Sequence, residues 1–568
     1  MPTPRECREQ ILSSDYYDFI ASQLGENEFE DLITEDTCMH EVEFVYNIIH
    51  VEKERADPLE FGRYSYNAIP KCYTLLDEAA MTQAGILQVQ NYPTLNLQGT
   101  DVIIGLIDTG IDYQNPIFRN LDGSTRIAGI WDQTIQDGTP PEGFFYGTEY
   151  RREQIDEALQ SENPLSVVPS TDENSHGTFL ASLAAGGASE ENRFIGAAPD
   201  ATLAVVKLKP AKQYLKDFYE IHTDAACYQE TDIMLGLSYL NGLAAQLDMP
   251  LVICIAVGTN LGGHSASSPL NGLLEIYANL AQRVIVIGTG NEANKRHHYL
   301  GVSQNINDVK EAEIRVPSGV NGFTLELWTT NPNIMKVTIV SPSGGRTPMF
   351  SVRETETQIY RFIFEGTRVS LTYKLFLERS NAELIIMQFQ APTEGVWKVI
   401  VEPLQVAEDV FHMWLPVTEF LQGDVYFLES NPDFTITEPG NTLTSMTVGF
   451  YNGVENSVAI SSGRGYTRGR GIKPDFVAPG VNVTGAVLRN QFAERTGSSI
   501  AVGITAGAAA LMLEWVIYVR GFQAADSVQV RSLLSLGTDR IEGETYPNRT
   551  WGYGTLNLYQ SFEELRRL

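Results

Sequence analysis

The sequence predicts an α/β protein: a parallel-sheet core with helices on both faces, a small α/β unit at the N-terminus and an inserted antiparallel β-sandwich. Short, continuously apolar runs alternate with helical segments, which is typical of a parallel sheet covered on both faces; these runs are 102–107, 203–207, 251–256 and 284–287. Between about 300 and 430, apolar residues alternate with polar ones, which indicates antiparallel strands with one solvent-exposed face. From about 435 the α/β pattern resumes.

These changes of pattern give the expected domain boundaries. We expect an N-terminal unit at 1–80, an α/β domain formed by 81–300 together with 431–568, and the β-sandwich at 301–430. No internal repeat interrupts this order.

The N-terminal unit holds a predicted helix, a predicted strand and most of the cysteines. The apolar spacing from Leu12 to Ile20 predicts the helix, and the run 43–51 predicts the strand. The number of cysteines is odd and no pair has the spacing of a metal site or a redox motif; they are Cys7, Cys38, Cys72, Cys227 and Cys254. So few cysteines in so long a chain predict reduced thiols rather than a disulfide framework.

The charge balance excludes two classes of partner. The chain has 71 acidic and 40 basic side chains, a formal net charge of −31, and such a surface repels nucleic acid and anionic membranes. The N-terminus lacks the apolar segment of a signal peptide, and no uninterrupted run of 18 apolar residues occurs. We therefore expect a soluble protein without conventional secretion.

A candidate catalytic carboxylate ends the first predicted core strand. Asp108 closes an apolar run and is followed by Thr109-Gly110, which breaks the strand. In open α/β sheets, functional side chains gather at the carboxyl ends of strands. A plain strand-end turn also explains Asp-Thr-Gly. Aspartic proteases carry the same motif, but they need two copies in a β protein, and this chain has one.

Two further candidates stand at the starts of helices rich in small residues, and a third follows a strand. His176 lies in Asn-Ser-His-Gly-Thr and Ser499 in Gly-Ser-Ser-Ile-Ala. A serine at a helix N-terminus gains from the helix dipole when negative charge develops nearby, although an N-cap serine has the same pattern. Asn291 follows an apolar strand and Gly290, where its amide can donate to an oxyanion or form a turn.

Together, and in the order Asp, His, Ser, these motifs resemble those of the subtilase family. The Asp-Thr-Gly, His-Gly-Thr and Gly-Ser-Ser-Ile-Ala blocks and the Gly-Asn pair correspond to the family's motifs, and the stretch 471–480 looks like the one that precedes its serine. The resemblance covers roughly 85–300 and 435–560. Ser498 replaces the usual threonine, and Gly503-Ile504 replaces the usual Pro-His, but neither change removes a catalytic group.

The resemblance implies a subtilisin-like serine endopeptidase. Ser499 would be the nucleophile, His176 the general base and acid, and Asp108 the carboxylate that orients the histidine. Asn291 and the backbone N–H of Ser499 would bind the oxyanion. The resemblance also implies that Gly258 and Thr259 lie in the strand that pairs with substrate, and that protein or peptide substrates are the partners. We expect no cofactor and no metal.

The arrangement of domains is similar to that of the clostridial spore-germination subtilases. A retained N-terminal prodomain, a β-domain inserted after Asn291 and the ending 546–559 carry this resemblance. It implies that the insert is a jelly roll, that the chain processes its own prodomain and retains it as an inhibitor, and that it makes limited cuts in a protein precursor such as a spore cortex-lytic proenzyme. It also implies a cytoplasmic or spore-associated location.

Other functions remain open at this point. Some members of that group have lost the triad and act as receptors or regulators, so a pseudoprotease is one alternative; the intact triad favours an active enzyme. A metal-dependent hydrolase built on His297-His298 is a second alternative, and a general intracellular degradative protease is a third.

The self-cleavage site is expected near the end of the prodomain. Pro70 biases Ile69 towards an extended conformation, and a cleft that pairs substrate as a β-strand needs an extended chain. We therefore expect one cut between about Tyr64 and Ala68.

Overall fold

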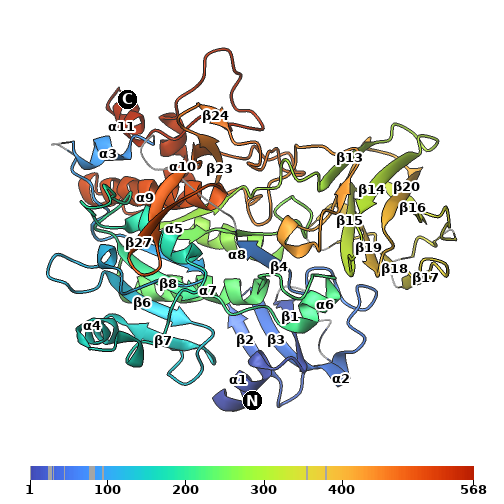
Figure 1. The fold of residues 1–568 in the computed structure, drawn as a ribbon, viewed down its shortest axis with the longest axis horizontal. Helices are drawn as coiled ribbons and strands as arrows, with labels where there is room; N and C mark the ends of the chain where they lie inside the picture. Colours follow the sequence, from blue (N-terminus) through green and yellow to red (C-terminus); the bar gives the residue numbers. More distant parts are fainter. Residues whose placement is uncertain are drawn as a thin grey trace.

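The protein is described from a computed structural model (Figure 1). The structure describes residues 2–23, 29, 31–43, 45–75, 84–92, 95–348, 350–353, 356–377 and 380–567.

The centre of the molecule is a mostly parallel sheet. Its strands lie in the order β24 (Ser457–Val458), β23 (Met446–Asn452), β12 (Arg283–Gly288), β10 (Leu251–Ile255), β5 (Ile103–Asp108), β8 (Thr202–Lys207), β6 (Ile127–Asp132) and β7 (Thr148–Arg151), and β25 (Phe476–Pro479) also pairs with β23. The pairs from β23 to β6 are parallel, whereas β7 and β24 run antiparallel at the two edges. Every residue of β5 is buried, which explains why its sequence is continuously apolar.

Helices cover both faces of this sheet, as the sequence predicts. Ile104 and Leu106 of β5 face the core that holds α5 (His176–Ala185) and α9 (Ser498–Glu514). The alternate residues Ile103 and Ile107 face the opposite core, which holds α7 (Glu230–Gln246) and α8 (Pro269–Ala278). Successive side chains of a strand point to opposite faces, so one apolar strand supplies both cores.

The helix that begins at Ser498 runs through the middle of the molecule. The segment Ser498–Val519 is long and apolar enough to cross a membrane, but 94% of its most apolar window is buried inside the protein. We therefore interpret this segment as the central core helix of the α/β domain. The hairpin formed by β26 (Val483–Val487) and β27 (Gln491–Arg495) directly precedes it.

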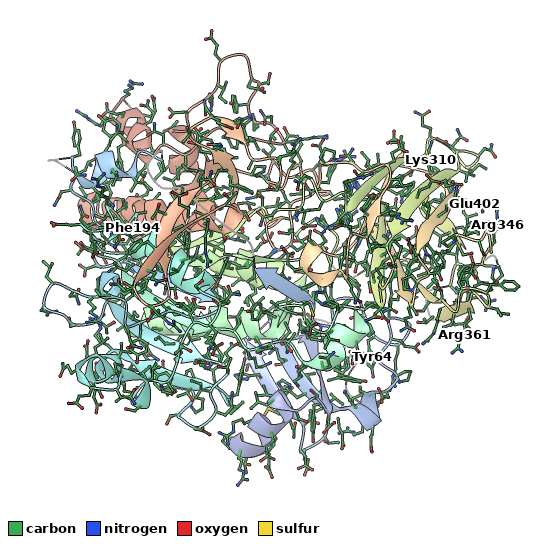
Figure 2. The ribbon with its side chains drawn as sticks, in the orientation of Figure 1. Tyr64, Phe194, Lys310, Arg346, Arg361 and Glu402 are labelled. Atoms are coloured by element: carbon green, nitrogen blue, oxygen red, sulfur yellow. A yellow bond between two sulfur atoms is a disulfide. The ribbon has the colours of Figure 1, made fainter. Side chains whose placement is uncertain are left out.

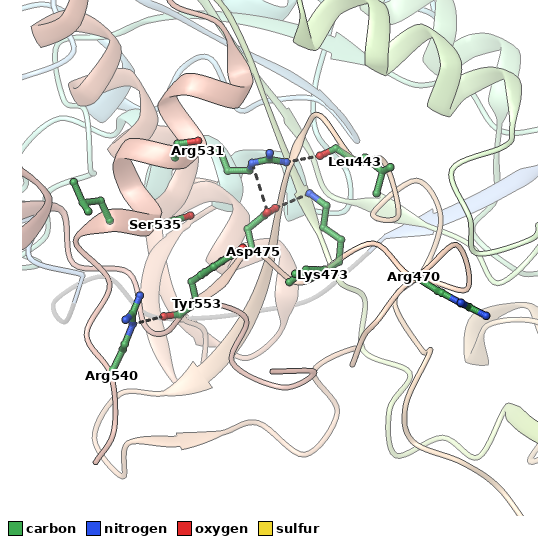
Figure 3. A pocket seen from close by; sticks show the side chains of 11 residues that line it. Leu443, Arg470, Lys473, Asp475, Arg531, Ser535, Arg540 and Tyr553 are labelled. Carbon is green, nitrogen blue, oxygen red and sulfur yellow. Dashed lines mark hydrogen bonds and ion pairs between the residues drawn. The ribbon is translucent and has the colours of Figure 1, made fainter. Parts of the chain in front are cut away.

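The other helices lie around this core, except α2 (Lys53–Ala56), which packs on the N-terminal sheet. The surrounding helices are α3 (Ile86–Gln90), α4 (Arg152–Gln160), α6 (Gln213–Phe218), α10 (Ser527–Leu536) and α11 (Leu558–Arg567). Figure 3 shows how α10 is attached: Asp475, just before β25, accepts from Lys473 Nζ at 2.6 Å and lies 3.6 Å from Arg531 Nε of α10. A surface cavity at this position is lined by Lys473 and Arg531, which these ion pairs engage, and also by Arg470 and Arg540.

The N-terminal unit is a helix packed on an antiparallel sheet. Helix α1 (Pro4–Leu12) is followed by β1 (Tyr16–Ser22), β2 (Cys38–Val42) and β3 (Tyr46–Glu52), in the order β1-β3-β2. The predicted helix over Leu12–Ile20 is therefore wrong, because the helix ends at Leu12 and the next segment is a strand. β1 pairs with β3 along its whole length, and aromatic and β-branched residues such as Phe19 and Ile20 favour a strand buried on both faces.

A disulfide joins Cys7 of α1 to Cys38 of β2. The prediction of reduced thiols is wrong for this pair, because packing of α1 on the sheet brings the two Cα atoms to 5.1 Å although 31 positions separate them in sequence. The remaining cysteines, Cys72, Cys227 and Cys254, are buried thiols.

The inserted segment forms two antiparallel sheets packed face to face around their own core, seen at the right of Figure 1. One sheet has the order β13 (His298–Val302), β21 (Val410–Trp414), β15 (Gly322–Thr330), β19 (Ala382–Gln390), β18 (Arg368–Lys374) and β17 (Thr357–Arg361). The other has the order β16 (Ile334–Val340), β20 (Gly395–Gln405), β14 (Lys310–Val316) and β22 (Tyr426–Phe427). The period-two alternation of the sequence reflects this arrangement, since each sheet buries one face against the other.

The segment expected to contain the self-cleavage site is buried between the N-terminal unit and the insert. Figure 2 shows Tyr64 at this junction, whereas Lys310, Arg346, Arg361 and Glu402 lie at the far end of the insert. The backbone oxygen of Tyr64 accepts from Lys374 Nζ at 2.9 Å, and Tyr66 and Ala68 are buried. The stretch folds into turns, so its predicted extended conformation is wrong, and the structure does not favour the predicted cut between Tyr64 and Ala68.

Candidate active site

Asp108 ends β5 and holds the imidazole of His176. Its Oδ1 accepts from His176 Nδ1 at 2.7 Å and from the backbone N–H of Thr109 at 2.8 Å. The carboxylate is fully buried. A side chain at Gly177 would meet the backbone oxygen of Gly110 at 2.2 Å, so a glycine after His176 is what lets the two segments approach so closely.

His176 is held at the first position of α5 by a second buried carboxylate, Asp172. Asp172 Oδ1 accepts from the backbone N–H of Ser175 at 2.9 Å and from the hydroxyl of Thr109 at 2.9 Å. Its Oδ2 accepts from the N–H and the hydroxyl of Thr178 at 2.9 and 2.7 Å. Asp172 thus ties the start of α5 to the residue after Asp108. Sequence reasoning missed Asp172 because it lies three residues before Ser175, the N-cap position where a capping side chain is expected.

Ser499 lies in the first turn of α9, directly beside α5. Only 2% of the residue is exposed. Arg495, just before the helix, hydrogen-bonds the hydroxyl of Ser175, so the chain leading to the serine is tied to the residue before the histidine. Gly503 also explains a departure from the family motif: a Cβ there would meet Leu180 Cδ1 of α5 at 2.9 Å, and glycine allows the two helices to pack closely.

Asn291 is attached to the same helix start. It follows β12 and Gly290, and its Oδ1 accepts from the backbone N–H of Ser498 at 3.1 Å. Because a backbone N–H can only donate, this bond fixes which end of the amide faces α9. The Nδ2 hydrogens are directed away from it and can serve as donors to an oxyanion.

A strand of the N-terminal segment lies where substrate is expected. β4 (Cys72–Leu75) is the central strand between β9 (Tyr228–Gln229) and β11 (Val257–Gly258), and it runs antiparallel to both. Gly258, predicted to pair with substrate, pairs with Thr74. Thr259 instead pairs with Glu438, with its N–H donating to the Glu438 backbone oxygen at 2.9 Å. The protein's own strand β4 thus pairs with Val257–Gly258, whereas Thr259 pairs with Glu438.

The two adjacent histidines considered for a metal site point to different partners. His297 Nδ1 donates to Glu292 Oε2 at 2.5 Å, whereas His298 Nε2 lies 3.0 Å from His412 Nδ1. Burial lowers the pKa of His298 to about 3. Within the part of the chain that the structure describes, no group of three or more histidine, cysteine or acidic side chains is arranged to hold a metal ion. His297 thus joins the start of the insert to Glu292, the residue after Asn291, whereas His298 and His412 lie on neighbouring strands of the insert.

The model of the subtilase family matches residues 99–381 and 424–554. The chain belongs to the subtilase family of serine peptidases. Among solved structures, the chain is similar to the CspB protease of Clostridium perfringens, with 29% sequence identity and a TM-score of 0.76, covering 86% of this chain and 98% of that one. No curated protein matches the chain in a sequence search. This subtilase therefore shares with CspB the parallel-sheet core, the N-terminal unit and the additional antiparallel sheets.

Proposed function

We propose that this subtilase is a serine endopeptidase that cleaves its own N-terminal segment and then makes limited cuts in a protein precursor. The observation that supports self-cleavage is the position of β4, which occupies the centre of a three-stranded sheet with β9 and β11. An extended chain that adds a strand to the edges of a cleft is a recognised mode of peptide binding. The protein's own segment thus occupies the cleft as a peptide substrate would.

In this proposal Ser499 Oγ attacks the carbonyl carbon while His176 Nε2 takes the hydroxyl proton. Asp108 keeps the proton of His176 on Nδ1 and stabilises the imidazolium that forms, which the 2.7 Å contact supports. Asn291 Nδ2 and the Ser499 N–H donate to the oxyanion. The imidazolium then protonates the leaving amine, and water attacks the acyl-enzyme with His176 again acting as base.

The strand register supports a cut just after β4. Thr74 pairs with Gly258 and Leu75 with Val257, and Leu75 is the last residue of β4. Ala256 follows Ile255, which pairs with Ile107, and it is therefore level with Asp108. This register supports cleavage of the Leu76–Asp77 bond. Both residues lie outside the described part of the chain.

Contacts that survive this cut support retention of the N-terminal segment as an inhibitor. Asp18 of β1 accepts from Lys212 Nζ at 2.7 Å and from His50 Nδ1 at 2.5 Å, and all three side chains are buried. Tyr66 donates to Glu326 of the insert at 2.7 Å. None of these contacts involves the bond proposed for cleavage, so the cut leaves the segment docked in the cleft.

A cleft occupied by its own segment supports limited processing rather than general degradation. The similarity to the CspB protease and the resemblance to the clostridial spore-germination subtilases support a precursor such as a spore cortex-lytic proenzyme as substrate. In this proposal the enzyme acts in the cytoplasm or in the spore.

N-terminal sequencing of purified wild type and Ser499→Ala tests the proposal. We expect wild type to yield two co-purifying fragments, the second beginning at Asp77, and Ser499→Ala to remain one intact chain. An intact wild-type chain with full peptidase activity would contradict self-cleavage. Failure of wild type to react with a fluorophosphonate at Ser499 once the N-terminal segment has been removed would favour the pseudoprotease, and rapid digestion of casein would favour general degradation.

A further inference from the structure

Glu292, the residue after Asn291, is a buried carboxylate that receives hydrogen bonds from three separate segments. Only 4% of the residue is exposed. Its Oε2 accepts from His297 Nδ1 at 2.5 Å and from Asn260 Nδ2 at 3.3 Å. Its Oε1 accepts from the backbone N–H and the hydroxyl of Thr418 at 3.3 and 3.0 Å. A carboxylate is tolerated inside a protein only when its oxygens are paired in this way, so these bonds hold the three segments in one arrangement.

Two of the three segments are the ends of the insert. His297 directly precedes β13, the strand that opens the insert, and Thr418 begins a short 3-10 helix (Thr418–Phe420) after β21. The third segment is the loop that follows the substrate strand β11, in which Asn260 lies. Glu292 is therefore the point where the insert, the substrate strand and the oxyanion segment meet.

The insert contacts the loop after β11 at further residues. Asn260 Nδ2 also donates to the backbone oxygen of Leu415 at 3.1 Å. The ring of His264 stacks on Trp414 with a centroid separation of 4.0 Å. The backbone N–H of Gly262 donates to Glu326 Oε2 of β15 at 3.0 Å. The loop after β11 is thus anchored on the insert at several residues, and Glu292 connects these anchors to Asn291.

The charge of Glu292 is maintained by its partners. Burial acts to raise the pKa of Glu292, but His297 and the donors of Thr418 outweigh it and hold the pKa below its ordinary value. The group is therefore an ionised carboxylate at neutral pH, which accepts hydrogen bonds at both oxygens and donates none.

We propose that Glu292 is a positioning residue through which the insert fixes the oxyanion amide of Asn291. Asn291 is one peptide bond from Glu292 and donates to an oxygen whose charge exists only in the transition state. Small misplacement of such a donor lowers the rate of the chemical step without weakening substrate binding. The proposal rests on the peptidase activity of the family and is independent of self-cleavage.

The test compares the steady-state kinetics of Glu292→Gln with wild type on a peptide substrate. Glutamine keeps the size of the side chain but turns an NH2 group towards donors that need an acceptor. We expect kcat and kcat/KM to fall together by about tenfold or more, with KM nearly unchanged. Thr418→Val, which removes the hydroxyl donor at the insert end, should lower kcat less. The double variant should fall by less than the product of the two single effects, because both break one link.

Glu383→Gln is the matched control. Glu383 is buried in the insert, where Met335 N–H donates to it at 3.2 Å, and burial raises its pKa to about 8. Its glutamine variant should keep the kcat of wild type. A Glu292→Gln enzyme that loses thermal stability but keeps its kcat would overturn the proposal, as would a rise in KM alone or an equal loss of kcat in Glu383→Gln. If Glu292→Gln does not fold, an unchanged kcat in Thr418→Val overturns it.

Discussion

Asn291 and Ser498 are joined by a hydrogen bond of 3.1 Å from the backbone N–H of Ser498 to the side-chain oxygen of Asn291. The amide proposed to bind the oxyanion is thereby anchored on the turn that carries the proposed nucleophile, Ser499. The bond fixes the two groups to each other before substrate arrives, and such preorganisation is what makes an oxyanion donor effective.

Removing this amide should therefore slow the chemical step. We expect Asn291→Ala to lower kcat by about 100- to 1000-fold with little change in KM, because the donor acts on charge that develops in the transition state. Asn291→Asp should be comparably slow, since it keeps the acceptor for Ser498 but cannot donate. Steady-state kinetics on a peptide substrate measure both variants, and a kcat within twofold of wild type for Asn291→Ala would show that another group binds the oxyanion.

The two adjacent serines at the start of α9 should differ sharply. Ser499→Ala should lower kcat by about a million-fold, as triad removals do in subtilisin. Ser498→Ala should change it little, because Ser498 is fully buried and, in the described part of the chain, its hydroxyl oxygen has no hydrogen-bond partner. Fluorophosphonate labelling followed by peptide mapping checks the order, and labelling that persists in Ser499→Ala would contradict the assignment.

The parallel-sheet core and the contact between Asp108 and His176 could be predicted from the sequence because the signals are local. A few neighbouring residues are enough to recognise the apolar strand that ends in Asp108. The same is true of the two helices whose first turns hold His176 and Ser499. The order of these elements along the chain then selects the fold. The close packing at Gly177 and Gly503 follows from the same small-residue motifs.

The rest depends on contacts between segments distant in sequence. Packing of α1 on β2 pairs Cys7 with Cys38, and no residue pattern near either cysteine predicts this disulfide. The strand β4 lies in the cleft because β9 and β11 supply hydrogen-bonding edges, whereas Pro70 suggested an earlier segment. Thr418 and Glu292 are separated in the sequence by most of the insert, and no local pattern predicts their contact.

Asp172 should support both stability and catalysis. In Asp172→Asn, one acceptor oxygen becomes an NH2 group that faces the donors of Thr178 or of Ser175 and Thr109. We expect the free energy of unfolding to fall by about 1–3 kcal/mol and kcat to fall by about tenfold, because the start of α5 sets the position of His176. Glu173→Gln is the neighbouring control, since that side chain is 81% exposed. Urea unfolding and kinetics measure the two effects, and equal behaviour of the two variants would exclude the role assigned to Asp172.

Acid should release the N-terminal segment through His40. This residue of β2 is 6% exposed, its Nε2 lies 3.0 Å from the backbone oxygen of Gly143, and its ring packs on Phe144 and Phe145 of the α/β domain. Burial, with a smaller contribution from His50, lowers its pKa to about 4.

A released segment would have an ordinary histidine pKa of about 6.5. Between pH 6.5 and pH 4 the released form therefore binds a proton that the docked form excludes, so docking weakens as the pH falls, by up to roughly 3 kcal/mol at pH 4. Asp18 does not oppose this change: burial acts to raise its pKa, but Lys212 and His50 hold it below the ordinary range, so it stays ionised in this window.

We expect wild type cleaved at the proposed bond to separate more readily by size exclusion at pH 5 than at pH 7.5. His40→Gln, which keeps a donor for Gly143 but does not titrate, should flatten this dependence. The uncleaved Ser499→Ala chain should show the same pH dependence in urea unfolding, and a His40→Gln profile identical to that of wild type would rule out this histidine as the cause.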